Sequence, residues 1–242
     1  VLAHITDPWM RDRLSREHPQ FGLSPFSYAG GAARQVMLAH PPFLLAEKLG
    51  APVQHILIVG FGQVGQSLVM EFIVTSTMPG AGRAKVTIVD PDAKRLHADF
   101  ESRHEELMQA IDFAFVEGDF RLNTSELVER IKARNGEAGI CAVYVAIDLD
   151  HRPLGLALAI RAMATQKGLF HAPIFVCAQH GAGLNAIRQG VGLVDGGAAN
   201  HEKLEQEATV GSRLCNLRVT SFGSWPDAFD RSEERRVGKE CL

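Results

Sequence analysis

Three glycines, Gly60, Gly62 and Gly65, stand between an apolar run and a segment of helical periodicity in the stretch HILIVGFGQVGQSL. A G-x-G-x-x-G loop of this kind brings backbone N–H groups and the positive end of a helix dipole close to a phosphate. The first glycine permits the tight turn, the second lets a pyrophosphate approach the backbone, and the third allows close helix–strand packing. The sequence therefore predicts a phosphate-binding loop. Its residues are Gly60, Phe61, Gly62, Gln63, Val64 and Gly65.

An acidic residue, Asp90, ends the next apolar run, KVTIVD. In dinucleotide-binding folds, a carboxylate at this place accepts hydrogen bonds from ribose hydroxyls, and its charge repels a 2′-phosphate. Asp90 could instead cap the following helix, but the glycine loop before it favours a role in ligand binding. We therefore expect the cofactor to be NAD or NADH, or another adenine nucleotide without a 2′-phosphate, rather than NADP.

Two further groups of polar residues follow predicted strands. Gly118 and Asp119 end the run FAFVEGD, where an ordinary turn explains them equally well. Asp148, Asp150 and His151 follow AVYVAI, at the edge of the sheet where ligands of such folds bind. They could form an acid–base group or a metal site, but no second cluster of ligating residues accompanies them in the sequence. We therefore expect a solvated loop here, with neither catalysis nor a metal.

Other patterns are less informative. The stretch HGAGLNAI (180–187) resembles a second glycine loop, although the start of a helix explains it more simply. Neither tyrosine, Tyr28 or Tyr144, has a lysine four residues later, which argues against a short-chain dehydrogenase.

Short apolar runs alternate with helical segments from His55 onward, and this alternation predicts right-handed crossovers and a parallel sheet. The expected fold class is α/β: a Rossmann-like doubly wound parallel sheet of about six strands with a short helical N-terminal lead-in. The expected strands cover residues 55–60, 85–90, 113–119, 142–148, 173–178 and 216–222. The expected helices cover residues 63–75, 92–110, 124–135, 152–167 and 183–189.

The first part of the chain differs in pattern. Residues 1–54 contain no strand-like run, and their segments TDPWMRDRLSRE, SPFSYAGGAARQVMLAH and PPFLLAEKLG each predict a short helix. The last of these is closed by Gly50. Apolar residues in these helices suggest that they pack on something. We expect a helical lead-in or linker at 1–54 and a nucleotide-binding domain at 55–230.

Composition excludes several classes of protein. Of 242 residues, 46% are hydrophobic and 22% are charged, as in ordinary globular proteins. The 25 basic residues against 28 acidic ones argue against nucleic-acid binding. No apolar run reaches the roughly 18 residues of a membrane helix. Four isolated cysteines, with no C-x-x-C pair, favour a reducing, cytoplasmic setting.

The order of the motifs resembles the nucleotide-binding domain called RCK or TrkA-N, which regulates potassium channels and transporters. The resemblance covers about residues 55–180. It rests on the stretches HILIVGFGQVGQSL, VTIVDPDAKRL, FVEGDF and VYVAIDLDHRPLGLALAIRAM. By this resemblance, Asp90 would bind the adenosine ribose and Asp119 would lie beside the adenine. Ala146 and Ile147 would line the crevice near the pyrophosphate and the second ribose.

The resemblance implies a regulatory domain that binds NAD(H) or another adenine nucleotide and controls the transport of potassium or another cation. Such a domain would be the cytoplasmic part of a homo-oligomer, with a membrane channel segment upstream of Val1. One alternative is the cofactor domain of an NAD-dependent oxidoreductase whose substrate domain is missing. Another is a Rossmann scaffold that binds nothing and mediates assembly. The fold alone does not decide among these functions.

The C-terminal stretch RSEERRVGKEC, within residues 231–242, resembles the translation of a short-read sequencing adapter. We expect this segment to be foreign to the fold, because it was then never selected to pack against the domain. Deleting residues 231–242 should therefore leave the melting temperature unchanged in calorimetry. A decrease of several degrees would show instead that the tail is part of the folded protein.

Overall fold

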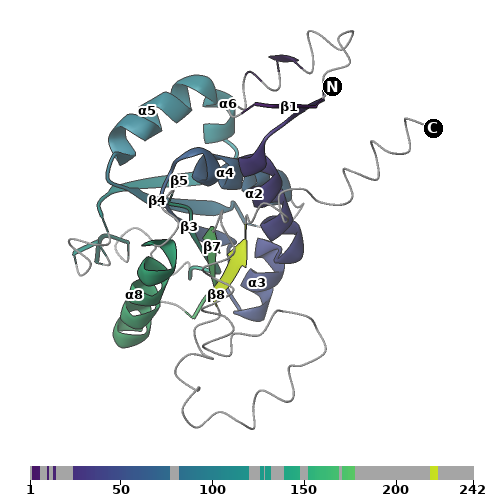
Figure 1. Cartoon of the computed structure of the whole chain (residues 1–242). Helices are drawn as coiled ribbons and strands as arrows, with labels where there is room; N and C mark the ends of the chain where they lie inside the picture. The colour runs from purple at the N-terminus through teal and green to yellow at the C-terminus, as the bar shows by residue number, and fades with distance from the viewer. Residues whose placement is uncertain are drawn as a thin grey trace.

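The described residues of the protein form a parallel six-stranded sheet. The computed structural model describes residues 2–5, 10, 13–14, 24–76, 82–119, 126–127, 129–131, 139–147, 152–168, 171–177 and 219–222. The strands are β3 (His55–Val59), β4 (Lys85–Asp90), β5 (Asp112–Glu117), β6 (Ala142–Val145), β7 (Ile174–Cys177) and β8 (Val219–Phe222). Their order is β5-β4-β3-β6-β7-β8, and every neighbouring pair is parallel (Figure 1). This is the strand order of a Rossmann fold, so the predicted fold class is confirmed.

The strands are nearly continuously apolar because both faces of the sheet are covered. Ile56 and Ile58 of β3 belong to the apolar core on one face, whereas Leu57 and Val59 belong to the core on the other. The first core contains residues of α4 (Gln63–Ser76), and the second contains residues of α8 (Arg152–Lys167). The sheet therefore lies between two layers of helices, as its alternation with helical segments predicts.

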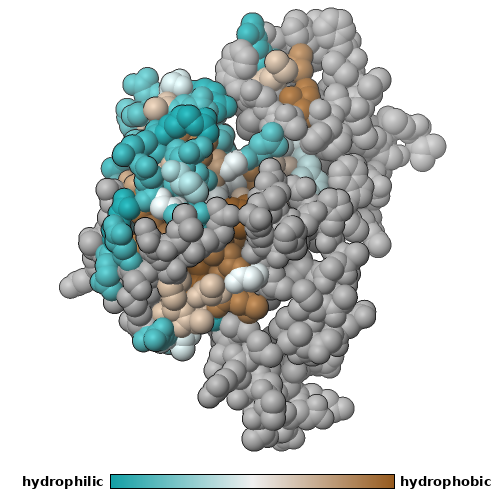
Figure 2. Space-filling view, turned by 60° about the vertical axis from the view of Figure 1, so that its left-hand side comes forward, coloured by the Kyte–Doolittle hydropathy of each residue, from teal (hydrophilic) through white to brown (hydrophobic). Residues whose placement is uncertain are grey.

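One predicted helix is divided in two. The segment expected at 92–110 forms α5 (Ala93–Arg103) and α6 (Glu105–Met108), because the backbone leaves the helical region at His104, with φ −140° and ψ 42°. Only Ala93 and Phe100 of α5 are buried. Figure 2 accordingly shows hydrophilic atoms gathered on the upper part of the described surface, at the height that α5 has in Figure 1.

The other predicted helices fall partly outside the described residues. Of the segment 124–135, positions 126–127 and 129–131 are described and are helical. The helix expected at 183–189 lies outside the described residues, as does most of TDPWMRDRLSRE. The strand predicted at 142–148 is shorter than expected, so that Ala146 and Ile147 follow its end.

The N-terminal segment contains a short strand pair that the sequence analysis did not predict. Strands β1 (Leu2–His4) and β2 (Ser24–Phe26) pair in parallel. Each has only three residues, too few to show an alternating pattern, and Pro25 lowers the apparent strand propensity of the second. Because of β2, the helix predicted within SPFSYAGGAARQVMLAH begins only at Tyr28, with Ser27 as its N-cap.

Two N-terminal helices complete the core. Helix α2 (Tyr28–Ala39) is capped by the Ser27 hydroxyl, which accepts a hydrogen bond from Gly30 N at 3.2 Å. Helix α3 (Pro42–Lys48) begins after Pro41 and is followed by Gly50, whose φ of 63° suits glycine. The predicted helical character of the N-terminal segment is therefore confirmed for α2 and α3. Its helices pack with α4 in one apolar core, together with Ile56, Ile58 and Val86.

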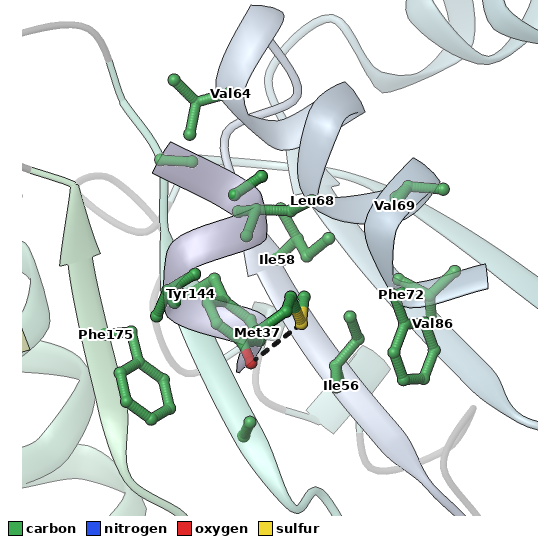
Figure 3. Packing of buried hydrophobic residues seen from close by; sticks show 14 of the residues in the cluster. Met37, Ile56, Ile58, Val64, Leu68, Val69, Phe72, Val86, Tyr144 and Phe175 are labelled. Carbon is green, nitrogen blue, oxygen red and sulfur yellow. Dashed lines mark hydrogen bonds between the residues drawn. The ribbon is translucent and has the colours of Figure 1, made fainter. Parts of the chain in front are cut away.

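Helix α2 also packs near the half of the sheet that contains β6 and β7. The ring of Tyr144 stacks on Phe175, with centroids 5.1 Å apart, and its hydroxyl donates to Met37 Sδ at 3.5 Å (Figure 3). The imidazole of His40, which follows α2, lies 4.9 Å from the Phe175 ring. Burial, and then the charge of Lys48, lower the pKa of His40, so this contact is made by a neutral ring. The N-terminal helices are thus joined to β6 and β7 as well as to α4.

Two neighbouring residues of α2 test whether this helix is part of the folded domain. Met37 is 1% exposed and Leu38 is 65% exposed. Met37→Ala should lower the free energy of unfolding by about 2 to 4 kcal/mol, because it leaves a cavity beside Tyr144. The matched control Leu38→Ala should change it by less than about 0.5 kcal/mol. Urea denaturation measures both values, and equal small effects would show that α2 is not anchored to the sheet.

Candidate functional site

The carboxyl ends of β3 and β6 lie side by side in the middle of the sheet. From this point the chain proceeds outward in one direction through β4 and β5, and in the other through β7 and β8. Gly60 N donates to Val89 O at 2.9 Å, and Ala146 N donates to Val59 O at 2.8 Å. The loops that follow β3 and β6 therefore begin at the same height along the sheet. In open α/β sheets, such a switch point forms the crevice where ligands bind.

Gly60 makes the tight turn that the sequence predicts. Its φ is 93°, which residues with side chains rarely adopt. A Cβ atom there would lie 2.7 Å from Ala146 O and 2.9 Å from Ile147 Cγ2. The first glycine therefore packs directly against Ala146 and Ile147, two predicted site residues that follow β6.

Gly65 and Gly62 have opposite surroundings. A Cβ atom on Gly65 would lie 2.3 Å from Gly60 O, so the start of α4 touches the backbone of the turn. A Cβ atom on Gly62 would meet no atom of the described residues within 4 Å. The first and third glycines are thus required by the packing of the loop itself. At Gly62 the fold leaves room, as expected where a pyrophosphate would approach the backbone.

The ring of Phe61 anchors the glycine loop to the apolar core. Its ring is fully buried, and it meets the rings of Phe100 and Phe115 edge-on, with centroids 5.3 Å and 5.4 Å away. Edge-to-face contacts of this kind are favourable for aromatic pairs. The sequence analysis placed Phe61 in the loop, but its apolar ring points into the core instead of toward a ligand.

The Asp90 carboxylate is hydrogen-bonded to the glycine loop. Asp90 Oδ2 accepts a hydrogen bond from Phe61 N at 2.8 Å, and Oδ1 accepts one from Asp92 N, also at 2.8 Å. The second bond orders the turn before α5, whose N-cap is Asp92 and not Asp90, while the first joins β4 to the glycine loop. Each carboxylate oxygen has two lone pairs, so each can accept one further hydrogen bond. Asp90 is half-buried, with one side at the surface.

Gly118 and Asp119 lie at the same edge, next to Asp90. Gly118 N donates to Asp90 O at 3.1 Å, and a Cβ atom on Gly118 would lie 2.7 Å from Leu127 Cδ1. Asp119 is half-buried. The preceding residue, Glu117, pairs with Lys94 Nζ at 2.9 Å. The third strand therefore ends in a close turn beside the carboxylate of the second.

The N-terminus of α4 faces this edge with unused donors. In the described part of the chain, no acceptor is within hydrogen-bonding geometry of the backbone N–H groups of Gly62, Gln63, Val64 and Gly65. The first backbone hydrogen bond of the helix is donated by Gln66 N to Gly62 O, at 2.9 Å. Consecutive free N–H groups at a helix N-terminus attract an anion.

Gln66 is a residue of the site that the sequence analysis missed. Its Nε2 donates to Phe61 O at 3.2 Å. The signal was its position directly after the third glycine, because side chains on a helix tilt back toward the N-terminus and a polar one there reaches the loop.

Two titratable side chains, Cys141 and Tyr144, lie in the core. Burial raises the pKa of Cys141 to about 11 and raises the pKa of Tyr144 further, so both stay protonated in the core. The residues in the ranges described above contain no group of three or more side chains suited to a metal. Asp148, Asp150, His151 and the stretch HGAGLNAI lie outside the described residues.

Comparison of the chain with protein-family models, curated proteins and solved structures finds no match. Among the helices that the structure describes, none combines the length and the apolar character needed to cross a membrane.

The glycines themselves can be tested through stability. Gly60→Ala and Gly65→Ala should each lower the melting temperature by several degrees, because one forces a positive φ on alanine and the other a backbone clash. Gly62→Ser should leave it within about 2 °C, since the space is open and serine is a good N-cap residue. Scanning calorimetry of the three variants would contradict this geometry if Gly62→Ser were the least stable.

Proposed function

We propose that the chain is a regulatory domain that binds NAD, NADH or another adenine nucleotide at the carboxyl edge of the sheet. In this proposal, it reports ligand occupancy to a partner that transports potassium or another cation. The observation that carries the binding proposal is the Asp90 carboxylate, which is hydrogen-bonded to the glycine loop and half-buried at the end of β4, beside the switch point between β3 and β6.

The residues present fit a dinucleotide. The free N–H groups from Gly62 to Gly65 suit the pyrophosphate, and the open space at Gly62 gives its oxygens access to the backbone. The two Asp90 oxygens each keep a lone pair, so together they can accept hydrogen bonds from the 2′- and 3′-hydroxyls of one ribose. These two groups are adjacent because Phe61 N donates directly to the carboxylate.

The remaining predicted residues extend the site to both sides. Gly118 and Asp119 continue it beyond Asp90, where the resemblance to the RCK or TrkA-N domain puts the adenine. Ala146 and Ile147 extend it on the other side of Gly60, where the same resemblance puts the pyrophosphate and the second ribose. The ligand would therefore lie across the carboxyl ends of β5, β4, β3 and β6.

The regulatory part of the proposal rests on the resemblance. A domain of this kind changes the state of an attached partner when a ligand binds one of its conformations better than another. The expected partners are a second copy of the chain and a membrane channel segment upstream. In this reading, Asp148 and His151 do no acid–base work.

Nucleotide preference tests the role of Asp90. We expect the domain to bind NAD at least tenfold more tightly than NADP, a difference of about 1.4 kcal/mol, because the carboxylate repels a 2′-phosphate. Asp90→Ala should weaken NAD binding and narrow this preference. The ratio of the two affinities, measured by titration calorimetry, is the informative quantity. Both ligands share a pyrophosphate, so a loosened loop weakens both alike.

A matched control removes the same charge two residues away. Asp92 is exposed, and its carboxylate pairs with Arg95 at 3.2 Å. Asp92→Ala should leave the NAD/NADP ratio within about twofold. A ratio that changes equally in both variants would mean that general electrostatics, and not a ribose contact, sets the preference.

Steady turnover would contradict the regulatory reading. Asp148→Ala and His151→Ala should leave nucleotide affinity within a few-fold. If the protein oxidises or reduces nicotinamide with a hydroxy- or oxo-substrate, and either change abolishes this activity, the chain is part of a dehydrogenase.

A further inference from the structure

Phe61 is held at three points, and the third of these is supplied by a side chain that no motif identifies. Its ring is buried between Phe100 and Phe115, its N–H donates to Asp90 Oδ2, and its carbonyl accepts from Gln66 Nε2. We propose that Gln66 is a positioning residue that fixes the peptide between Phe61 and Gly62, so that the Gly62 N–H faces the phosphate. This inference rests on the proposed function, because it concerns the same nucleotide site.

The orientation of this peptide follows from its geometry. A carbonyl oxygen only accepts hydrogen bonds, so the Gln66 amide must present its nitrogen to Phe61 O, at 3.2 Å. The structure contains no cis peptide bond among the described residues. In a planar trans peptide, C=O and N–H point in opposite directions. With Phe61 O turned toward Gln66, the N–H of Gly62 points away from the Gln66 side chain.

This peptide is the part of the loop that would otherwise rotate. The preceding peptide, between Gly60 and Phe61, is fixed because Phe61 N donates to Asp90, and the peptide before that is fixed because Gly60 N donates to Val89 O. The following residues are fixed as the first turn of α4, where Gln66 N donates to Gly62 O. Between these anchors, Gly62 has no Cβ, and a Cβ there would meet no atom of the described residues within 4 Å, so the side-chain restriction on φ that opposes a flip at other residues is absent here.

A flipped peptide would harm phosphate binding in particular. It would remove one N–H group from the row at Gly62–Gly65 and replace it with a carbonyl oxygen, whose partial negative charge repels the ligand. The hydrogen bond from Gln66 is neutral, and it biases the unflipped form by the amount that one such bond contributes. Its loss should therefore reduce the affinity for a phosphate-bearing ligand by about threefold to tenfold.

The test compares a ligand with phosphates and one without. Gln66→Met keeps the length of the side chain and removes the donor, and Gln66→Glu replaces the donor by an acceptor that repels Phe61 O. We expect calorimetry to show ADP affinity reduced about threefold to tenfold in Gln66→Met and more in Gln66→Glu. Adenosine affinity should stay within about twofold. Gln109→Met, the same change at an exposed residue after α6, is the control and should alter neither affinity.

A second readout in the free protein keeps the inference testable even if binding is weak. In Gln66→Met the amide resonance of Gly62 should show new exchange broadening on the microsecond to millisecond scale, as expected of a flipping peptide. The inference is overturned if the Gly62 resonance is unchanged and ADP affinity is retained, or if ADP and adenosine affinities fall together. A wild-type protein that binds neither ADP nor NAD contradicts the proposed function itself, and the role of Gln66 with it.

Discussion

The glycine loop, around which the candidate site is arranged, follows the carboxyl end of β3, a strand whose five residues are all buried. Such a strand is stable only if helices cover both faces and strands pair on both edges, since a buried backbone must find its hydrogen bonds within the protein. That requirement brings β4 and β6 to its sides. The ends of these two neighbours carry Asp90 and Ala146, so the demand for burial at β3 also assembles the residues around the glycine loop.

Asp90 has a structural contact and keeps capacity for a ligand. Its oxygens accept from Phe61 N and Asp92 N, each oxygen keeps one lone pair, and the residue is half-buried. In the proposed function, Asp90 would couple the shape of the loop to the binding of a ribose. Replacing Asp90 would therefore lower nucleotide affinity in two ways, by loosening the glycine loop and by removing the ribose contact. Only the ratio of the NAD and NADP affinities separates these two effects.

The sheet and the glycine loop could be predicted because local signals are strong there. Apolar β-branched runs define the strands, and the roles of Gly60 and Gly65 follow from a spacing with a known mechanism. The break at His104 could not be predicted, because the apolar residues Leu96, Phe100 and Leu107 recur at spacings that suit one continuous helix. The contacts of Phe61 with Phe100 and of Gln66 with the loop depend on side-chain directions in the folded chain. The short pair β1 and β2 depends on pairing between distant segments.

The contact between Met37 and Tyr144 joins residues 107 positions apart. A ribosome therefore completes α2 long before it has made β6 and β7, the strands on which that helix rests. Until they emerge, the apolar side of α2, with Ala33, Val36 and Met37, has only part of its native cover. Contacts of such high order slow folding and leave apolar surface open to wrong partners. The N-terminal helices, though synthesised early, are thus expected to be among the last elements to settle in the newly made protein.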